Sequence, residues 1–358
     1  MSTAAPIRVL VVDDSVFMRS ILKDAMVHAE GIEVIGSAQN GTEAVNRILS
    51  LRPDVVTLDV EMPGLTGIEV LDQVMKTAPT PIIMVSTKTQ AGAKTTVEAL
   101  ARGAIECVAK PLAGAGGSTL QAFREQVIRA VRTAASSRRR NLGGSTARKP
   151  AVVALPRSFA DDAVVAIGIS AGGPQSLHQM LPAIPASFPP ILITQHMPAG
   201  FTGPFADRLN SVCKCRVKEA ATGDILAPGA IYIAPGHAHL RVVPRGVKLA
   251  IHLSDGPKIS GFKPSVDAMF DSLLAVVPAR TVAVVMTGMG SDGAAGLKKL
   301  KERGAQTISQ NQETSIVYGM PKAAAETGCV DQIVPLHEIP RAIAAALQRL
   351  CASSARVG

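Results

Sequence analysis

The chain has 358 residues, more than one hydrophobic core usually holds, so we expect two domains. Hydrophobic residues make up 47% of it and charged residues 18%, which excludes a mainly disordered chain. The net charge of +9 would suit an acidic partner, but much of it lies in one short segment, which we interpret as a solvated basic linker with Arg138, Arg139, Arg140, Arg148 and Lys149.

The first ~130 residues alternate between apolar runs typical of buried parallel strands and segments with helical spacing. The expected strands are Ile7–Val12, Glu33–Ala38, Asp54–Leu58, Pro81–Val85 and Glu106–Ala109. The expected helices are Phe17–Val27, Glu43–Leu51, Ile68–Thr77, Thr95–Arg102 and Leu120–Arg132. This alternation predicts an α/β domain over residues 1–133, built on a five-stranded, doubly wound parallel sheet.

The pattern stops in residues 134–158, where we expect a flexible basic linker because Ser, Arg, Gly and Pro dominate. Residues 159–358 form the expected second domain, with strands predicted at Ala163–Ile169, Ile191–Thr194, Ala230–Ala234, Val247–His252 and Thr281–Thr287. Helical spacing returns at Val266–Val276, Ala294–Arg303 and Ile339–Leu350. We expect a second doubly wound α/β domain, mostly parallel, with hairpin-like strands around residues 230–253.

No apolar run reaches the ~18 residues that a membrane span needs, and the N-terminus lacks the apolar segment of a signal peptide. The five cysteines are odd in number and scattered, which argues against a disulfide framework. We therefore expect a cytoplasmic protein without membrane insertion. Neither Cys213 with Cys215 nor His237 with His239 has the further ligands of a zinc site, and we expect a structural role for the histidines.

Five polar side chains stand at or just after the carboxyl ends of strands in the first domain: Asp13, Asp14, Asp59, Ser86 and Lys110. The carboxyl ends of parallel strands share one edge of a sheet, so we expect the group to meet there. Each residue alone has a simpler explanation, such as a helix cap for Asp14 or surface charge for Lys110.

Three neighbouring carboxylates repel one another unless a cation joins them, and oxygen ligands suit Mg²⁺. We therefore predict a Mg²⁺ site made by Asp13, Asp14 and Asp59. Bound Mg²⁺ would neutralise an incoming phosphoryl group and leave Asp59 as its acceptor. In this hypothesis Lys110 pairs with the phosphate and Ser86 forms a hydrogen bond to it.

Three residues of different chemistry follow apolar runs in the second domain. Ser170 lies in a Gly-x-Ser-x-Gly motif, His196 follows the next run, and Asp292 lies in a glycine-rich segment. If the three strands are neighbours, Asp292 can orient His196, and His196 can accept the proton of Ser170. Gly172 and Gly173 would let a substrate approach the backbone closely.

Simpler or different readings exist for the same residues. His196 alone fits a hydrogen-bonded structural histidine, and Asp292 alone fits a turn residue. The order Ser, His, acid differs from the Ser, acid, His order of α/β-hydrolases. The glycines around Ser170 also resemble a dinucleotide fingerprint, but a serine replaces the central glycine and no acid ends the next strand.

The first domain resembles response-regulator receiver domains over about residues 6–132. The matching segments are Val12-Asp13-Asp14-Ser15, Leu58-Asp59-Val60-Glu61-Met62-Pro63, Val85-Ser86 and Ala109-Lys110-Pro111. The resemblance implies that a histidine kinase of the CheA type phosphorylates Asp59, with Mg²⁺ bound by Asp13, Asp14 and Asp59. The fifth strand lacks the aromatic residue that receivers often use as a switch element.

The second domain resembles the catalytic domain of the chemotaxis protein-glutamate methylesterases, the CheB family, over about residues 160–350. The matching segments are Ile167-Gly168-Ile169-Ser170-Ala171-Gly172-Gly173-Pro174, Gln195-His196-Met197-Pro198-Ala199-Gly200-Phe201-Thr202, Ile233-Ala234-Pro235-Gly236-His237, Ser265-Val266-Asp267, and Met286-Thr287-Gly288-Met289-Gly290-Ser291-Asp292-Gly293.

This second resemblance implies that Ser170, His196 and Asp292 are the nucleophile, the base and the orienting acid. The implied substrates are glutamate methyl esters on methyl-accepting chemotaxis receptors, with methanol as a product and with deamidation of receptor glutamines as a related activity. No cofactor is implied for the catalytic domain. Ala171 stands where the family often has threonine, which leaves the oxyanion to backbone amides such as those of Ala171 and Met289.

Together the two resemblances imply an esterase whose active-site edge is covered by the receiver until phosphorylation of Asp59 weakens the packing. A non-catalytic signalling adaptor is the alternative from another functional class, and an intact Ser, His, Asp set argues against it. A DNA-binding regulator fits poorly, because the output domain is near ~200 residues long and no groove-entering motif is found in it.

Overall fold

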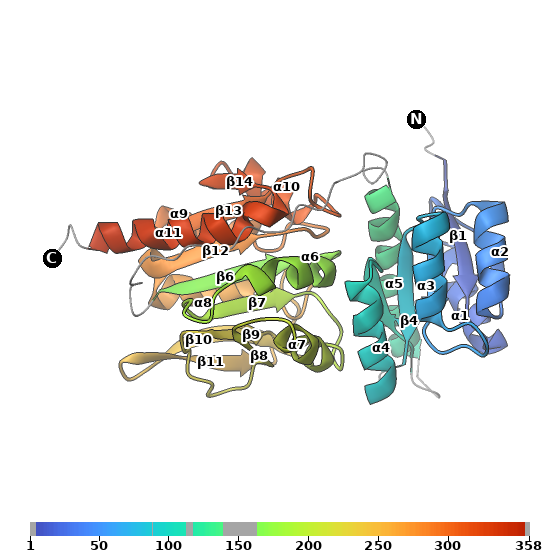
Figure 1. Cartoon of the computed structure of the whole chain (residues 1–358), viewed down its shortest axis with the longest axis horizontal. Coiled ribbons are helices and arrows are strands. Elements are labelled where there is room, and N and C mark those ends of the chain that lie inside the picture. The colour runs from blue at the N-terminus through green and yellow to red at the C-terminus, as the bar shows by residue number, and fades with distance from the viewer. Residues whose placement is uncertain (1–4, 88, 112–116, 139–162, 355–358) are drawn as a thin grey trace. The chain divides into compact units, whose positions relative to one another are not determined.

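The computed structural model describes residues 5–87, 89–111, 117–138 and 163–354. The chain divides into two compact units, residues 1–144 and residues 145–358 (Figure 1). Each unit is built on its own parallel sheet with helices on both faces. The α/β class predicted for both halves is therefore confirmed.

The first unit contains a five-stranded parallel sheet in the order β2-β1-β3-β4-β5. Its strands are β1 Ile7–Val12, β2 Ile32–Ala38, β3 Val55–Asp59, β4 Ile82–Ser86 and β5 Glu106–Ala109. Its helices are α1 Val16–Val27, α2 Gly41–Leu51, α3 Gly67–Thr77, α4 Gln90–Ala101 and α5 Gly117–Arg138. The strand order reverses between β1 and β3, and the crevice for chemistry in such sheets lies at the carboxyl ends of these two strands.

The start of α3 is packed tightly against the end of β3. Thr66 and Glu69 form a capping box, in which each side chain accepts a hydrogen bond from the backbone amide of the other residue. A Cβ atom at Gly67 would lie 2.2 Å from the Asp59 carbonyl oxygen, so this position needs glycine. The backbone of Asp59 is thereby held between its strand and the following helix.

Helix α5 is longer than the sequence predicts. It continues to Arg138, so the expected linker does not begin at residue 134. Phe123, Val127 and Ala134 recur at helical spacing and are all buried, which extends the apolar face beyond the predicted end at Arg132. The remainder of the expected linker, residues 139–158, lies outside the described residues.

The second unit contains a seven-stranded parallel sheet in the order β14-β13-β12-β6-β7-β9-β8. Its strands are β6 Val164–Ile169, β7 Ile191–Gln195, β8 Arg216–Glu219, β9 Ala230–Ile233, β12 Thr281–Val285, β13 Gln306–Gln310 and β14 Gln332–Val334. The strands β10 His239–Arg245 and β11 Lys248–Ser254 pair antiparallel as a separate hairpin. A hairpin therefore lies in the range where hairpin-like strands were predicted, but the strand predicted at Ala230–Ala234 is β9 of the parallel sheet, and β10 was not predicted.

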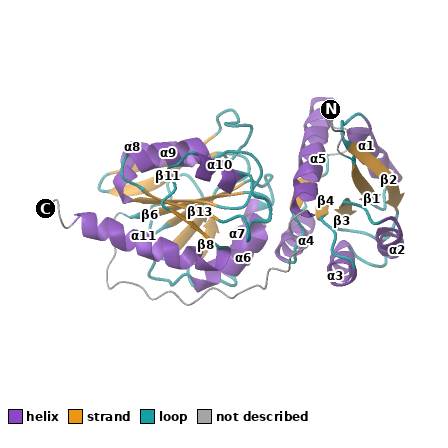
Figure 2. Cartoon of the chain, turned by 90° about the horizontal axis from the view of Figure 1, so that it is seen from above, coloured by secondary structure: helices purple, strands orange, loops and turns teal. Residues whose placement is uncertain are grey.

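Helices cover both faces of this sheet (Figure 2). They are α6 Gly173–Met180, α7 Thr202–Asn210, α8 Val266–Val276, α9 Ala294–Glu302, α10 Met320–Glu326 and α11 Ile339–Ser354. Helices α8, α9 and α10 lie on one face, and α6 and α11 lie on the other. The core is mainly aliphatic, as the composition predicts, with buried phenylalanines such as Phe201 and Phe270 among its largest side chains.

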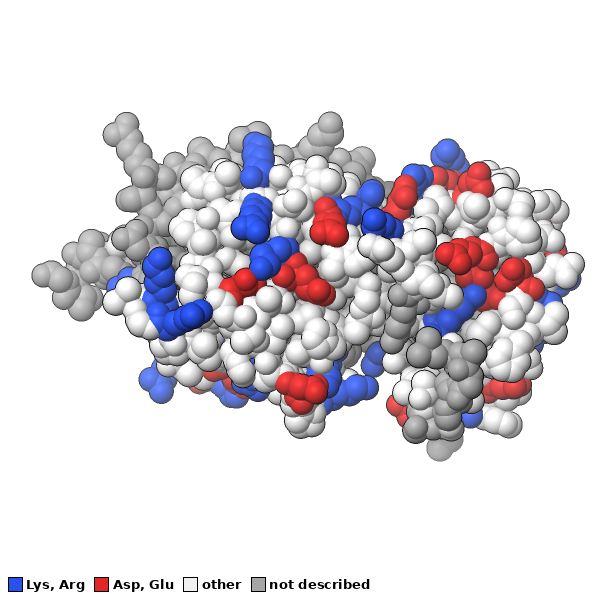
Figure 3. Space-filling model, turned by 90° about the horizontal axis from the view of Figure 1, so that it is seen from below, with Lys and Arg blue, Asp and Glu red and all other residues white. Residues whose placement is uncertain are grey.

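The structure bears on three expectations drawn from composition. No helix in the described ranges is long and apolar enough to cross a membrane. Within those same ranges no disulfide joins any of the five cysteines. On the face drawn in Figure 3, acidic side chains lie among the basic ones, so this face carries mixed charge despite the net charge of +9.

Candidate functional site

The acids and the lysine predicted to meet in the first unit lie at the carboxyl ends of β1, β3 and β5. Lys110 Nζ lies 2.9 Å from Asp13 Oδ2 and 2.8 Å from Asp59 Oδ2. Asp13, Asp14 and Asp59 each offer a carboxylate oxygen, and these oxygens lie within 4.8 Å of one another. The structure thus brings three acids from two strand ends together with a cation from a third.

This set of side chains fits a hard divalent cation. Its donors are all carboxylate oxygens, which such cations prefer. Asp13 and Asp59 are buried while Asp14 is exposed, so an ion held between them would keep access to water. In the described part of the chain this is the one group of three or more acids, histidines or cysteines close enough to hold a metal.

Asp59 is a buried carboxylate whose pKa is affected by opposing influences. Its pKa is raised to about 6, because burial and the charge of Asp13 outweigh the hydrogen bond and charge of Lys110, which act to lower it. Its Oδ1 accepts a hydrogen bond of 2.7 Å from the Val60 amide. Additional positive charge at this edge would offset the desolvation of the carboxylate and favour its ionised form.

Ser86 ends β4 beside this cluster, but its side chain has other partners. Its hydroxyl donates to the carbonyl oxygens of Thr87, at 3.3 Å, and of Gly92, at 3.4 Å. The side chain is only 1% exposed. Among the described residues no hydrogen bond joins Ser86 to the three acids, so its contact with a phosphate stays a prediction.

In the second unit, the three residues proposed for catalysis follow neighbouring strands. Strand β6 lies between β12 and β7 in the sheet, Ser170 directly follows β6, and His196 directly follows β7. The His196 amide donates to the Ile169 carbonyl at 3.1 Å, and the Ser170 amide donates to the Thr287 carbonyl at 2.9 Å. Strand pairing therefore carries the backbones of all three segments to one edge.

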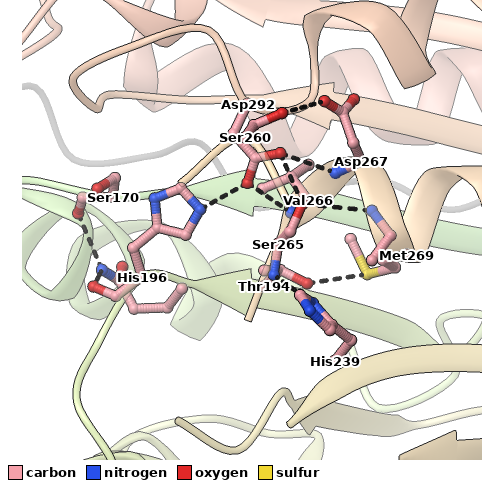
Figure 4. Close-up of polar contacts among 12 residues, drawn as sticks. Ser170, Thr194, His196, His239, Ser260, Ser265, Val266, Asp267, Met269 and Asp292 are labelled. Atoms are coloured by element: carbon pink, nitrogen blue, oxygen red, sulfur yellow. Dashed lines mark hydrogen bonds and ion pairs between the residues drawn. The ribbon is translucent and has the colours of Figure 1, made fainter. Parts of the chain in front are cut away.

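The imidazole of His196 is hydrogen-bonded to Asp292. His196 Nε2 lies 2.8 Å from Asp292 Oδ2, and the imidazole lies between Asp292 and Ser170 (Figure 4). Asp292 also accepts hydrogen bonds from the Val266 amide at 2.7 Å, the Asp267 amide at 3.0 Å and Ser265 Oγ at 2.8 Å. The carboxylate thus sits at the N-terminus of α8, where free amides and the helix dipole favour negative charge.

These contacts keep Asp292 ionised. Burial acts to raise its pKa, but the hydrogen bond and charge of His196 and the amides of Val266 and Asp267 outweigh burial, so the pKa lies below its ordinary value. The neighbouring Asp267 behaves in the opposite way, because burial and the charge of Asp292 raise its pKa. An ionised Asp292 accepts a hydrogen bond from His196 Nε2–H and so fixes the tautomer of His196.

The other imidazole nitrogen is left as an acceptor on the side of Ser170. With the proton on Nε2, His196 Nδ1 carries a lone pair, and it is buried without a hydrogen-bond partner in the described part of the chain. Ser170 lies on the side of the imidazole opposite to Asp292 (Figure 4). No hydrogen bond between Ser170 and His196 is formed here, although such bonds are often long without substrate.

The loop after β12 passes directly against Ser170. A Cβ atom at Gly288 would lie 2.7 Å from Ser170 Cβ and 2.4 Å from Met320 Sδ, so only glycine leaves room. Met289 follows this glycine, and Ala171 follows the serine in the turn after β6. The two residues proposed to donate amides to an oxyanion therefore belong to segments that touch at the serine.

Sequence reasoning missed the side chains that hold the acid and the imidazole in place. Ser265 is the N-cap of α8 and donates to Asp292, and its amide donates to His239 Nδ1 at 3.2 Å. His239 is fully buried, and its Nε2 donates to the Pro257 carbonyl at 2.9 Å. The structural role predicted for His239 is confirmed, and the serine just before an apolar helical run was the available signal for the cap.

Phe262 is a second contact that the sequence did not reveal. Its ring stacks on the His196 imidazole with centroids 3.9 Å apart and an angle of 7° between the planes. Paired hydrogen bonds of 3.0 Å and 2.9 Å between the backbones of Ile259 and Phe262 fold the loop that carries it. The imidazole is therefore held at one edge by Asp292 and on one face by an aromatic ring.

Comparisons with known proteins cover both units. The CheB methylesterase family model matches residues 165–343, and the response regulator receiver domain model matches residues 9–116. The chain is 45% identical to a protein-glutamate methylesterase/protein-glutamine glutaminase of Pyrococcus abyssi over 97% of its length and 95% of that protein. A relative of the same description from Geobacillus kaustophilus is also 45% identical, over 94% of this chain and 97% of that protein.

Among solved structures, the second unit is similar to the crystal structure of the CheB methylesterase catalytic domain of Thermotoga maritima. The identity is 40% and the TM-score is 0.51, and the alignment covers 52% of this chain and 98% of that domain. The similarity therefore extends through nearly the whole of the solved catalytic domain.

Proposed function

The chain belongs to the CheB methylesterase family, and from this membership we propose how its residues hydrolyse glutamate methyl esters on methyl-accepting chemotaxis receptors. The enzyme is a protein-glutamate methylesterase regulated by phosphorylation, and it also acts as a protein-glutamine glutaminase. The observation that carries the catalytic assignment is the Asp292–His196 hydrogen bond of 2.8 Å, with the second imidazole nitrogen open toward Ser170.

In the first half of the reaction, Ser170 Oγ attacks the ester carbonyl carbon while its proton passes to His196 Nδ1. Asp292 stabilises the imidazolium that forms. The backbone amides of Ala171 and Met289 donate hydrogen bonds to the negatively charged carbonyl oxygen. The imidazolium then gives its proton to the departing methoxy group, so methanol leaves and an acyl-Ser170 ester remains.

In the second half, water attacks the acyl-enzyme while His196 removes one of its protons. Collapse of the second tetrahedral intermediate returns the proton to Ser170 Oγ and frees the glutamate side chain. With a glutamine substrate the same steps release ammonia in place of methanol. The catalytic residues are thus restored without any cofactor in this mechanism.

In the first unit, Asp13, Asp14 and Asp59 would hold Mg²⁺. The bound ion would neutralise negative charge on an incoming phosphoryl group. The Asp59 carboxylate accepts the phosphoryl group from a histidine kinase of the CheA type. Lys110, which pairs with Asp13 and Asp59 here, moves its ammonium to the phosphate oxygens, and the Ser86 hydroxyl turns to donate to them. We propose that all of this takes place in the cytoplasm.

Regulation follows from an equilibrium between a less active and a more active state, in which the phosphate on Asp59 favours the more active state. The activation is limited to the free energy by which the phosphate prefers that state. A non-catalytic adaptor would lack all of these steps, and covalent labelling of Ser170 by an ester-directed probe distinguishes the two hypotheses.

Replacement of Asp59 by asparagine should abolish activation, because the amide cannot accept a phosphoryl group. We expect methanol release to rise with a small acyl phosphate and Mg²⁺ in the wild type and to stay at the basal rate in Asp59→Asn. Asp72→Asn is the matched control, because Asp72 pairs with Arg102 on the surface of the same unit. A full rise in the Asp59→Asn protein would exclude Asp59 as the phosphorylation site.

Replacement of Phe262 by leucine should lower kcat/KM for ester hydrolysis about fivefold, since a stacked aromatic pair is worth about 1 kcal/mol beyond its buried area. Leucine preserves an apolar contact but not the flat face that stacks on His196. Phe262→Tyr keeps that face and should stay within about twofold of the wild type. Equal rates for leucine and phenylalanine at this position would show that the stacking does not contribute.

A further inference from the structure

Gln195, the last residue of β7, connects the two catalytic turns through its side chain. Its Nε2 donates one hydrogen bond of 3.0 Å to the Ser170 carbonyl and another of 3.0 Å to the His196 carbonyl. The residue is only 2% exposed, so it does not reach the substrate. A single amide group therefore links the backbone of the nucleophile to the backbone of the base.

The surroundings allow this side chain only one orientation. Both partners of Nε2 are carbonyl oxygens, so exchanging the amide nitrogen and oxygen would set acceptor against acceptor. Its Oε1 is buried and has no hydrogen-bond partner among the described residues. A buried acceptor without a partner is unfavourable, so the two donated bonds must outweigh that cost.

A glycine on the neighbouring helix makes room for the link. A Cβ atom at Gly173 would lie 2.0 Å from Gln195 Oε1, closer than any real contact of that kind. Gly173 is the first residue of α6, and its amide donates to the Ser170 carbonyl at 2.8 Å. The Ser170 carbonyl thus accepts from both the helix start and Gln195, which restrains the turn that carries the hydroxyl.

We propose that Gln195 is a positioning residue that sets the distance and angle between Ser170 and His196 through their carbonyl groups. The proposal rests on the assignment of these two residues as nucleophile and base. The two turns follow adjacent strands, yet their side chains lie beyond the last strand pairing, Ile169 with Gln195. Past that pairing one backbone bond, from the His196 amide to the Ile169 carbonyl, joins the two turns, and the two bonds of the Gln195 amide add to it to fix their separation.

Loss of these hydrogen bonds should disturb the alignment of the Ser170 hydroxyl with the His196 imidazole, but not the binding of the substrate. A misaligned hydroxyl and imidazole lowers the rate of proton transfer and attack, whereas the surface that contacts the substrate is unchanged. We therefore expect kcat to fall while KM stays nearly constant. A residue that only stabilises the fold would instead lower the fraction of active protein and leave the reactivity of each folded molecule unchanged.

The test uses full-length Gln195→Met and Gln195→Glu proteins. Methionine keeps the length of the side chain but removes both donors, and an ionised glutamate sets a carboxylate against the two carbonyls. We expect the rate of Ser170 labelling by a fluorophosphonate, per folded molecule, and kcat for methanol release to fall about 10- to 100-fold in both variants, with KM within about twofold of the wild type. Faster hydrogen exchange confined to the turns after β6 and β7 should accompany the loss.

Tyr232→Phe is the matched control, because it removes a hydrogen bond of 2.8 Å to the Ile225 carbonyl from the strand next to β7. Its labelling rate should equal that of the wild type. The proposal is overturned if the Gln195 variants are labelled at the wild-type rate, or if Tyr232→Phe loses as much of its labelling rate as they do. It is also overturned if the Gln195 variants change in KM alone and not in kcat. Labelling that persists in Ser170→Ala would refute the serine assignment instead, and the exchange measurement would still decide whether Gln195 restrains the two turns.

Discussion

Replacement of Ser170 by alanine should lower the rate of methanol release from methylated receptor by about 10⁴-fold or more. Removal of the nucleophile from a cooperating serine, histidine and acid set removes most of the catalysis that the set provides. Alanine deletes one oxygen from a side chain that is 7% exposed and tightly packed against Gly288, so the fold should persist. The measurement is single-turnover methyl release at saturating enzyme.

A control variant separates this effect from general damage to the second unit. Ser211→Ala removes a hydroxyl that donates to the Arg208 carbonyl at the end of α7, and it should keep the wild-type rate. Alanine at position 170 should also abolish labelling by a fluorophosphonate. Methyl release at the wild-type rate from the Ser170→Ala protein would rule out the serine mechanism as a whole.

Replacement of Asp292 by asparagine should lower kcat by about 10³- to 10⁴-fold. An amide nitrogen facing His196 Nε2 would donate a hydrogen bond to it instead of accepting one, so the imidazole would carry its proton on Nδ1 and could not take the proton of Ser170. Asparagine also has fewer acceptor sites for the donors at the start of α8, from Ser265, Val266 and Asp267. We expect a loss of roughly 1.5–3 kcal/mol in the free energy of unfolding as well.

Two measurements distinguish the catalytic and structural parts of this prediction. Urea denaturation gives the free energy of unfolding, and kcat per folded molecule gives the catalytic loss. Asp271→Asn on the same helix is the matched control, because Asp271 forms a partly exposed ion pair with Lys299 and should change neither quantity much. A normal kcat in the Asp292→Asn protein would show that Asp292 has no role in the mechanism.

The pH dependence of stability should differ between the wild type and Asp292→Asn. The folded-state pKa of Asp292 lies below its ordinary value, so its ionisation stabilises the fold above the unfolded-state pKa, and this contribution disappears as the pH falls through the folded-state value. The variant lacks this contribution, and the difference in unfolding free energy between the two proteins should therefore narrow in acid.

The first unit illustrates how much a regular pattern of apolar runs predicts. All five strands were expected close to their observed positions, and the pattern is clearest in β3 and β4, because a strand buried on both faces must be apolar along its length. The predicted start of α4, Thr95, is five residues later than the observed start at Gln90. Its first turn contains small and polar residues, whose position in a helix depends on the Thr89 cap and not on an apolar face.

The second unit illustrates where such patterns stop being informative. Helix α6 and strand β13 were not predicted, and both are rich in polar residues. Thr307 on β13 is fully buried, and its hydroxyl donates to the Cys329 carbonyl at 2.7 Å. A polar side chain can be buried when a distant partner satisfies it, and the local sequence carries no sign of that partner.

The sequence by itself determined that Asp59, Ser170 and His196 stand at or just after the carboxyl ends of apolar strands. Burial has a local signature in the spacing of apolar residues, which explains why these positions could be predicted. Only the tertiary structure decided which side chains touch: the bond between His196 and Asp292 spans 96 positions, Gln195 donates to the Ser170 carbonyl, and Phe262 stacks on His196. Such contacts depend on the order of strands in the sheet and on the path of the loops, which are properties of the folded chain and of no single segment.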